Sequence, residues 1–371
     1  MSIEDVWFDM LKVLAEKGSD LFISEGATPM IKIHGSMERI GDQKISKSDA
    51  MSILKSMMSE EDIAQYQLSK SANFAHSVKC VGRFRVNLFF QRNSMGMVLR
   101  SIKSVIPTLD ELNLPPIIRK ISSEKRGMVI FVGATGSGKS TSLASMIQYR
   151  NSEESGHILT IEDPIEYLHT NNKSLVNQIE IGIDAVDYTQ ALENALRQAP
   201  DVILMGEIRT QSTMDYAVAF SETGHLCLST LHANNANQAI DRIINFFPPE
   251  RRSQLLMDLS LNLKAIISQR LLPTIDGKRT AAVEILFGSP LVSDKILSGS
   301  IHEIKDLMKK GEEYGMQTFD QDILRLYTSG IISKDVAVRN ADSATDVSQA
   351  IKAFDLQSSS RGDISKKWDI V

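Results

Sequence analysis

The chain of 371 residues contains very little cysteine: only Cys80 and Cys227, which lie far apart and form no C-x-x-C pair. Structural zinc sites of the ribbon type need closely spaced thiol and imidazole ligands, so this sequence predicts no structural zinc. So few thiols are typical of a protein from a reducing, cytosolic compartment.

The sequence also lacks any apolar run that approaches the ~20 residues of a membrane-spanning helix. The first residues, Met1–Asp9, are acidic and amphipathic, which does not fit a secretory signal peptide. We therefore expect a cytoplasmic protein with no direct membrane insertion, which reaches a membrane only through a partner.

Positive charge is not in excess, because the formal net charge is −5, and aromatic residues make up only 6% of the chain. Nucleic-acid binding requires a basic face, and binding of single strands adds aromatic side chains. No stripe of the sequence combines the two. The composition therefore disfavours a nucleic-acid partner.

The chain is longer than one hydrophobic core usually serves, so we expect two domains. The N-terminal part predicts an α+β domain over residues 1–103. Its predicted helices cover 3–17, 47–57 and 59–68, and its predicted strands cover 20–24, 30–34, 37–40, 72–78, 84–91 and 95–103. A proline-containing linker with short helices follows over 104–126.

From Gly127 the pattern becomes strand, loop, helix, which predicts a core of mainly parallel strands over 127–288 with helices on both faces. The predicted strands are 128–132, 157–161, 201–205 and 225–230, and the predicted helices are 139–150, 187–198, 211–222 and 249–268. A hairpin near 269–287, a bundle of four helices over 289–355 and a mobile tail over 356–371 complete the expectation.

A glycine-rich loop follows the first core strand, and it fits the pattern G-x-x-x-x-G-K-[ST] from Gly133 to Ser140. In such a loop, backbone N–H groups point at phosphate oxygens, the lysine reaches the β- and γ-phosphates, and the serine hydroxyl ligates Mg²⁺. We expect this loop to bind ATP and Mg²⁺. Its residues are Gly133, Ala134, Thr135, Gly136, Ser137, Gly138, Lys139, Ser140 and Thr141.

Acidic residues follow two further core strands. Glu162 lies in Thr160–Glu166, at the end of the second strand, where a carboxylate can orient or deprotonate the attacking water; the alternative is a simple Asp-Pro turn. Glu207 ends the apolar strand that begins at Asp201. Because Gly206 stands where such strands usually carry Asp, Glu207 is expected to hold the hydrated Mg²⁺.

Two histidines, His225 and His232, lie at opposite ends of another apolar strand. His232, at the C-terminal end, is better placed to sense a γ-phosphate, whereas His225 is as well explained by a structural hydrogen bond. In the N-terminal domain, Arg83 and Arg85 share one strand face, and a hairpin brings Arg100 alongside. Two interpretations stay open: a solvated basic face, or an arginine clamp on the triphosphate.

Together these motifs resemble the PilT/PilU family of type IV pilus retraction ATPases, which belongs to the secretion ATPase superfamily. The resemblance rests on five stretches: GATGSGKST (133–141), TIEDPIEY (160–167), DVILMGEIR (201–209), TGHLCLSTLH (223–232), and RFRVN (83–87) with Arg100. GMQTFDQ (315–321) and RNADS (339–343) are similar to the PilU branch, and the AIRLG motif of PilT appears only as EIKDLMKKG (303–311). The four-cysteine insertion of extension-type relatives is missing.

The resemblance implies a PAS-like N-terminal domain and a RecA-like ATPase core, assembled as a homo-hexamer. It implies that Glu162 is the catalytic carboxylate, that Glu207 holds the metal, that His225 and His232 form the histidine pair, and that Arg85 and Arg100 fold over the nucleotide. It also implies two partners, a PilT-like paralogous ATPase and the inner-membrane platform protein of the pilus. The protein would then work in the cytoplasm, peripherally at the inner membrane.

Two other functions stay open. One is a nucleotide-binding adaptor that hydrolyses little ATP by itself and acts only with a partner retraction ATPase. The other is a motor on nucleic acid, because RecA-like rings include helicases, although the acidic net charge of −5 disfavours it.

Overall fold

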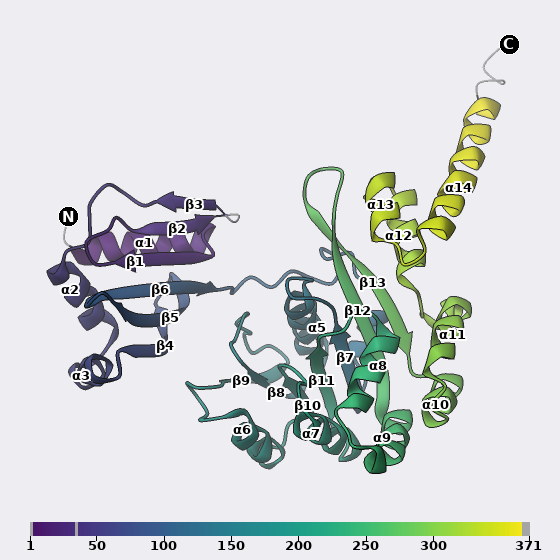
Figure 1. The fold of residues 1–371 in the computed structure, drawn as a ribbon, viewed down its shortest axis with the longest axis horizontal. Coiled ribbons are helices and arrows are strands. Elements are labelled where there is room, and N and C mark those ends of the chain that lie inside the picture. Colours follow the sequence, from purple (N-terminus) through teal and green to yellow (C-terminus); the bar gives the residue numbers. More distant parts are fainter. Residues whose placement is uncertain (1–2, 34–35, 366–371) are drawn as a thin grey trace. The chain divides into compact units, whose positions relative to one another are not determined.

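The computed structural model describes residues 3–33 and 36–365, and the chain divides into two compact units (Figure 1). The first unit comprises Met1–Ile106, Asp163–Thr170 and Ile179–Gln190. The second comprises Pro107–Glu162, Asn171–Gln178 and Ala191–Val371. Two short segments of the predicted core therefore belong to the first unit, and the chain crosses repeatedly between the units.

The first unit contains a six-stranded sheet in the order β3-β2-β1-β6-β5-β4, with every neighbouring pair antiparallel. The strands are β1 (Asp20–Ser24), β2 (Met30–Ile33), β3 (Ser36–Arg39), β4 (Ser71–Val78), β5 (Gly82–Gln91) and β6 (Ser94–Ile102). All six were predicted within one or two residues at their ends. In β5 the buried side chains of Phe84, Val86 and Leu88 alternate with Arg85 and Asn87, which is typical of a strand with one face on a core.

Three helices accompany this sheet: α1 (Ile3–Lys17), α2 (Lys47–Met57) and α3 (Glu60–Ser69). The apolar stripe of α1, including Trp7 and Leu14, is buried in one cluster with Phe84 and Val86 of β5. Both α2 and α3 begin with a capping box. The side chain of a serine accepts from the backbone N–H of an aspartate three residues later, and the side chain of that aspartate accepts from the backbone N–H of the serine. The predicted α+β class of this unit is confirmed, and its PAS-like character stays a prediction.

The second unit is built on a seven-stranded sheet in the order β13-β12-β7-β11-β10-β8-β9. The pairs from β12 through β8 are parallel, and β13 joins β12 antiparallel. The strands are β7 (Gly127–Val132), β8 (Gly156–Glu162), β9 (Ser174–Glu180), β10 (Val202–Met205), β11 (Leu226–Leu231), β12 (Leu263–Pro273) and β13 (Arg279–Phe287). The short apolar runs of β7 and β10 are buried throughout, as expected for central parallel strands.

Helices lie on both faces of this sheet. On one face, Val129 and Phe131 of β7 share a buried cluster with Leu143 and Ile147 of α5 and with Ile118 of α4. The helices of this part of the chain are α4 (Ile117–Ser122), α5 (Lys139–Glu153), α6 (Tyr188–Ala195), α7 (Gln211–Glu222), α8 (Ala236–Asn245) and α9 (Pro249–Asn262). The predicted α/β class is thereby confirmed.

The C-terminal region is helical, and its part from Phe319 onward packs on the face of β12 and β13 that is opposite α5. Leu272 and Ala282 point to this face and are buried with Phe319 and Ile323 of α12. The helices are α10 (Pro290–Leu297), α11 (Ile304–Lys310), α12 (Phe319–Thr328), α13 (Lys334–Asn340) and α14 (Ala344–Ser365), so the described residues hold five helices here instead of the predicted four. Because α14 continues to Ser365, much of the predicted tail is helical, and residues 366–371 lie outside the described residues.

Three further details differ from the prediction. The helix predicted to reach residue 268 ends at Asn262, and β12 begins at Leu263. The segment that follows contains Ile266 and Ile267, both fully buried, and it pairs with β7 on one side and β13 on the other, so tertiary pairing overrides the helical pattern. The strand β9 and the helix α8 were not predicted at all.

Candidate active site

Four parallel strands of the second unit end at one edge of the sheet, and the register places their ends within two residues of one another. Val132 of β7 pairs with Leu231 of β11, while Met205 of β10 pairs with Ser229 of β11 and Ile161 of β8. In spatial order, Gly133 follows β7, His232 follows β11, Gly206 follows β10, and Glu162 is the last residue of β8. Ligands of open α/β sheets bind at such carboxyl ends, so the register gathers the glycine-rich loop, the histidine and the acids at one candidate site.

The glycine-rich loop spans the gap between β7 and α5, and its backbone needs glycine at two close approaches. A Cβ on Gly133, whose φ is +152°, would lie 2.5 Å from the carbonyl oxygen of Gln269. A Cβ on Gly138, whose φ is +92°, would lie 2.7 Å from Nε2 of the same glutamine. The loop is therefore packed directly against β12, and Ser142 of α5 reinforces this contact by donating to Gln269 Oε1 at 2.8 Å.

The loop carries donors that fit a phosphate. The Nζ of Lys139 donates to the carbonyl oxygens of Gly133 and Ala134, at 2.7 and 3.0 Å, so the buried ammonium lies inside the loop. The Oγ of Ser137 is buried and has no hydrogen-bond partner. The helix α5 begins at Lys139, which directs its first N–H groups at the same place. These donors and the close-packed glycines fit a nucleotide phosphate.

A cavity of about 290 Å³ lies beside the loop. It is lined by Gly133, Ala134, His232, Ala233, Asn234, Gln238 and Arg242. Gln238 and Arg242 are one helical turn apart on α8, and they were missed because that helix was not predicted. Gln269 was missed for a related reason, since the segment that contains it was not recognised as a central strand.

Glu207 is held between two basic groups. Its Oε2 accepts from Arg209 Nε at 2.7 Å, and its Oε1 lies 3.2 Å from His232 Nε2. Its side chain is only 16% exposed, whereas that of Arg209 is 68% exposed. The predicted metal-binding carboxylate and the predicted phosphate sensor are thus in direct contact.

Glu162 lies at the end of β8, and two neighbours fix its carboxylate. Thr160 Oγ1 donates to Glu162 Oε1 at 2.7 Å, and Gln178 Nε2 of β9 donates to the same oxygen at 3.2 Å. The backbone beside it is tied to the neighbouring strand, because Gly206 N donates to Ile161 O at 2.9 Å. The predicted catalytic carboxylate is therefore oriented by its surroundings.

His225 lies at the other end of β11. Its carbonyl oxygen accepts from Gly127 N, at the start of β7, and its ring Nδ1 lies 3.0 Å from Thr223 Oγ1 and 3.1 Å from Phe220 O. The second unit therefore does not bring His225 together with His232, and its local contacts are those of a structural histidine.

All three predicted arginines, Arg83, Arg85 and Arg100, lie in the first unit. Arg85 of β5 is directly opposite Arg100 of β6, across a two-residue turn in which Arg92 and Asn93 both have positive φ, 48° and 62°. Arg100 Nε donates to the buried Asp20 at 2.7 Å. The predicted placement of the two guanidiniums on one sheet face is confirmed by this register.

The buried carboxylate of Glu180 accompanies these arginines. Burial raises its pKa above the usual range, and the positive charges of Arg85 and Arg83 oppose that rise. The guanidiniums of this face therefore have acidic neighbours inside their own unit.

No cluster of three or more histidine, cysteine or acidic side chains that could hold a metal ion occurs among the described residues. Ser140 and Glu207 are the side chains of the candidate site that could hold a metal, together with phosphate oxygens and water. Mg²⁺ prefers such a set, with one or two carboxylates and several waters.

The chain matches the family described as "Type II/IV secretion system protein" over residues 3–313. The chain belongs to this family. It is 53% identical over 345 residues to the type IV pilus ATPase PilU of Pseudomonas aeruginosa, and this match covers 92% of this chain and 90% of that relative. It is 38% identical over 334 residues to the type IV pilus retraction ATPase PilT of the same organism, over 90% and 97% of the two chains.

The fold is also similar to a solved member of the secretion-system family, the crystal structure of the pilus retraction motor PilT with bound ADP. The TM-score is 0.84 at 36% identity, and the match covers 94% of this chain and 98% of that one. These similarities confirm three predictions: the PilT/PilU family, the α/β ATPase fold and ATP hydrolysis as the activity. Within the described residues, no helix is both long and apolar enough to cross a membrane.

Proposed function

We propose that this chain is an ATP-driven motor subunit that powers or assists type IV pilus retraction, and hence twitching motility, as the names of PilU and PilT indicate for those relatives. The observation that carries the proposal is the row of residues at the ends of four neighbouring parallel strands: Gly133 follows β7, His232 follows β11, Gly206 and Glu207 follow β10, and Glu162 ends β8. A phosphate-binding loop, a metal-binding acid and a water-orienting acid are the parts that phosphoryl transfer to water requires.

Each residue of the row has a proposed role. The loop N–H groups and Lys139 hold the phosphates of ATP, and Ser140 and Glu207 hold Mg²⁺, which neutralises charge on the phosphates. Glu162, with its carboxylate fixed by Thr160 and Gln178, orients the attacking water and accepts its proton. His232, 3.2 Å from Glu207, links the metal-binding acid to the cavity wall. His225 has a supporting role at the far end of β11.

Arg85 and Arg100 form the proposed clamp on the triphosphate. Their cross-strand pairing places two guanidiniums on one face, a suitable arrangement for a polyanion. Loss of the γ-phosphate on hydrolysis removes a partner from them, which would bias the chain between two states and so convert chemistry into movement.

The proposed assembly is a homo-hexameric ring that works with a PilT-like paralogue and with the inner-membrane platform protein of the pilus. The ring would lie in the cytoplasm, peripherally at the inner membrane. An adaptor that binds ATP and hydrolyses it only beside a partner ATPase is the second candidate, and the similarity to PilU favours it over a motor on nucleic acid.

The test is ATP turnover by the purified chain and two variants. Lys139→Ala should abolish turnover, and Glu162→Ala should reduce it by about a hundredfold or more while ADP binding is kept. The matched controls are Lys125→Ala and Glu153→Ala, which change exposed residues outside the nucleotide-binding motifs and should leave turnover unchanged. Near-normal turnover in Lys139→Ala would refute the site.

The same assay separates the two candidates. A motor turns over ATP alone, whereas an adaptor does so only after addition of the partner ring. Stimulation of turnover by DNA would instead support a motor on nucleic acid.

A further inference from the structure

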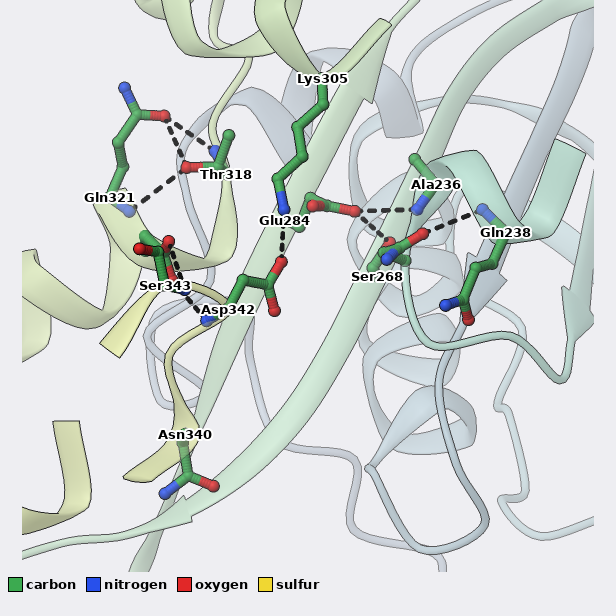
Figure 2. Close-up of polar contacts among 12 residues, drawn as sticks. Ala236, Gln238, Ser268, Glu284, Lys305, Thr318, Gln321, Asn340, Asp342 and Ser343 are labelled. Carbon is green, nitrogen blue, oxygen red and sulfur yellow. Dashed lines mark hydrogen bonds and ion pairs between the residues drawn. The ribbon is translucent and has the colours of Figure 1, made fainter. Parts of the chain in front are cut away.

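A carboxylate outside the predicted site, Glu284 of β13, is buried with 2% of its surface exposed. It lies directly opposite Ser268 of β12, and its Oε1 accepts from Ser268 Oγ at 3.1 Å and from the backbone N of Ala236 at 2.8 Å (Figure 2). Burial raises the pKa of Glu284, and these two hydrogen bonds partly oppose the rise. Burying a carboxylate costs stability, and only its hydrogen bonds and charged neighbours offset that cost.

The contact to Ala236 fixes the beginning of α8. Ala236 is the first residue of that helix, and the cap residue Asn235 accepts from Gln238 N at 2.9 Å. The four residues from His232 to Asn235 join β11 to this first turn. Glu284, which lies on β13, therefore anchors the first residue of α8, just after the segment that leads from His232 at the candidate site into this helix.

This anchored segment forms most of the cavity wall that faces the glycine-rich loop. Of the residues that line the cavity, five lie between His232 and Arg242, and the other two are Gly133 and Ala134. His232, at one end of the segment, is 3.2 Å from Glu207. A shift of the first turn of α8 would thus move both the cavity wall and the histidine that contacts the metal-binding acid.

A second group of charges lies beside the anchor on the same face of the sheet. Asp342 accepts from Arg270 of β12 and from Lys305 of α11, both at 2.7 Å, and Figure 2 shows Lys305 and Asp342 next to Glu284. Arg270 also donates to Asn340 O at 2.9 Å. These contacts tie Lys305 of α11 and the segment 340–342 to each other and to β12, beside Glu284.

We propose that Glu284 is a positioning residue for ATP turnover, whose buried carboxylate holds the first turn of α8, and with it the segment from His232 to Gln238, in register with the glycine-rich loop. This inference rests on the proposed function of the loop. It predicts a defect in catalysis rather than in nucleotide binding, because Lys139 and the loop N–H groups do not depend on the anchor.

The test uses the full chain with Glu284→Leu, which removes the acceptor at similar volume, and Glu284→Gln, whose side-chain carbonyl can still accept from both donors. The matched control is Asp322→Leu. Asp322 is also buried, at 1% exposure, and it accepts from Val283 N of the same strand at 2.8 Å and from Arg325 Nε at 2.7 Å, two donors that do not belong to α8.

We expect Glu284→Leu to lower kcat by on the order of ten- to a hundredfold, as for a small misplacement of reacting groups, with ADP affinity within about twofold of the parent chain. Glu284→Gln should restore most of kcat. Asp322→Leu should lower the melting temperature as much as Glu284→Leu does but leave kcat, measured well below the transition, unchanged.

A second measurement does not depend on turnover. Hydrogen exchange at Ala236 and its neighbours in the first turn of α8 should become faster in Glu284→Leu and not in Asp322→Leu. Equal losses of kcat in the two leucine variants, a parallel loss of ADP affinity, or unchanged exchange in Glu284→Leu would each overturn the proposal. Absence of ATP hydrolysis by the parent chain would refute the proposed motor function. Hydrogen exchange in the first turn of α8 would still decide whether Glu284 anchors this helix.

Discussion

His169 makes the first unit sensitive to acid. His169 lies in the segment Asp163–Thr170, which directly follows Glu162. A backbone hydrogen bond joins this segment to the residue after β6, because Leu168 N donates to Lys103 O at 2.9 Å. Burial lowers the pKa of His169 from its usual 6.5 to about 4. The folded chain therefore leaves this ring uncharged at pH values where the unfolded chain protonates it.

The sign of the effect follows from proton binding. Between pH 6.5 and about 4, the unfolded state binds one more proton at this ring than the folded state, so the free energy of unfolding falls as the pH falls. The loss is about 1.4 kcal/mol for each pH unit, or about 3 kcal/mol over the whole window. Because His169 keeps part of its surface exposed, this value is an upper limit.

The perturbation is His169→Gln, which cannot take up a proton in this range. Thermal unfolding of parent and variant is compared between pH 7 and pH 4.5, and the melting temperature of the parent should fall more steeply. The control is His302→Gln, since the side chain of His302 is 83% exposed. Other groups titrate equally in both chains, so the difference between the two slopes isolates His169. Parallel slopes for parent and His169→Gln would refute the reasoning.

Two further substitutions test the packing of the site. Gly133→Ala should weaken ADP binding by at least tenfold, because the new Cβ would lie 2.5 Å from the carbonyl oxygen of Gln269. The control is Gly277→Ala, which is also at positive φ (+79°) but in open space, and it should leave ADP binding unchanged in the same titration. Phe131→Ala should reduce the free energy of unfolding by about 3–5 kcal/mol in denaturant melts, because Phe131 is fully buried in the cluster that includes α5. An equal loss in Val105→Ala, which changes an 82% exposed residue, would contradict this prediction.

The sequence was most informative where local pattern and tertiary environment agree. Strands such as Gly127–Val132 and Val202–Met205 are continuous apolar runs because both faces are covered, so they were predicted closely. The glycine-rich loop was predicted because its chemistry depends on a fixed spacing of residue types. The pairing of Arg85 with Arg100 followed from a short turn between two alternating strands.

Predictions failed where distant segments decide the local structure. Leu263–Ser268 continues a helical pattern, yet it becomes a central strand because β7 and β13 pair with it. The contact of Gln269 with the loop, and that of Glu284 with Ala236, join residues far apart in the chain. No local pattern contains such information, so these residues emerge only from the fold.

The interleaving of the two units limits how this protein can be divided. A chain cut after Ile106 would keep the six strands of the antiparallel sheet and lose the segments 163–170 and 179–190 that belong with them. Lys103 would then lack the backbone partners that Glu166 and Leu168 provide. Neither half is therefore a module that a gene fusion can transplant intact, and a recombination breakpoint between them would strip the first unit of part of its own fold.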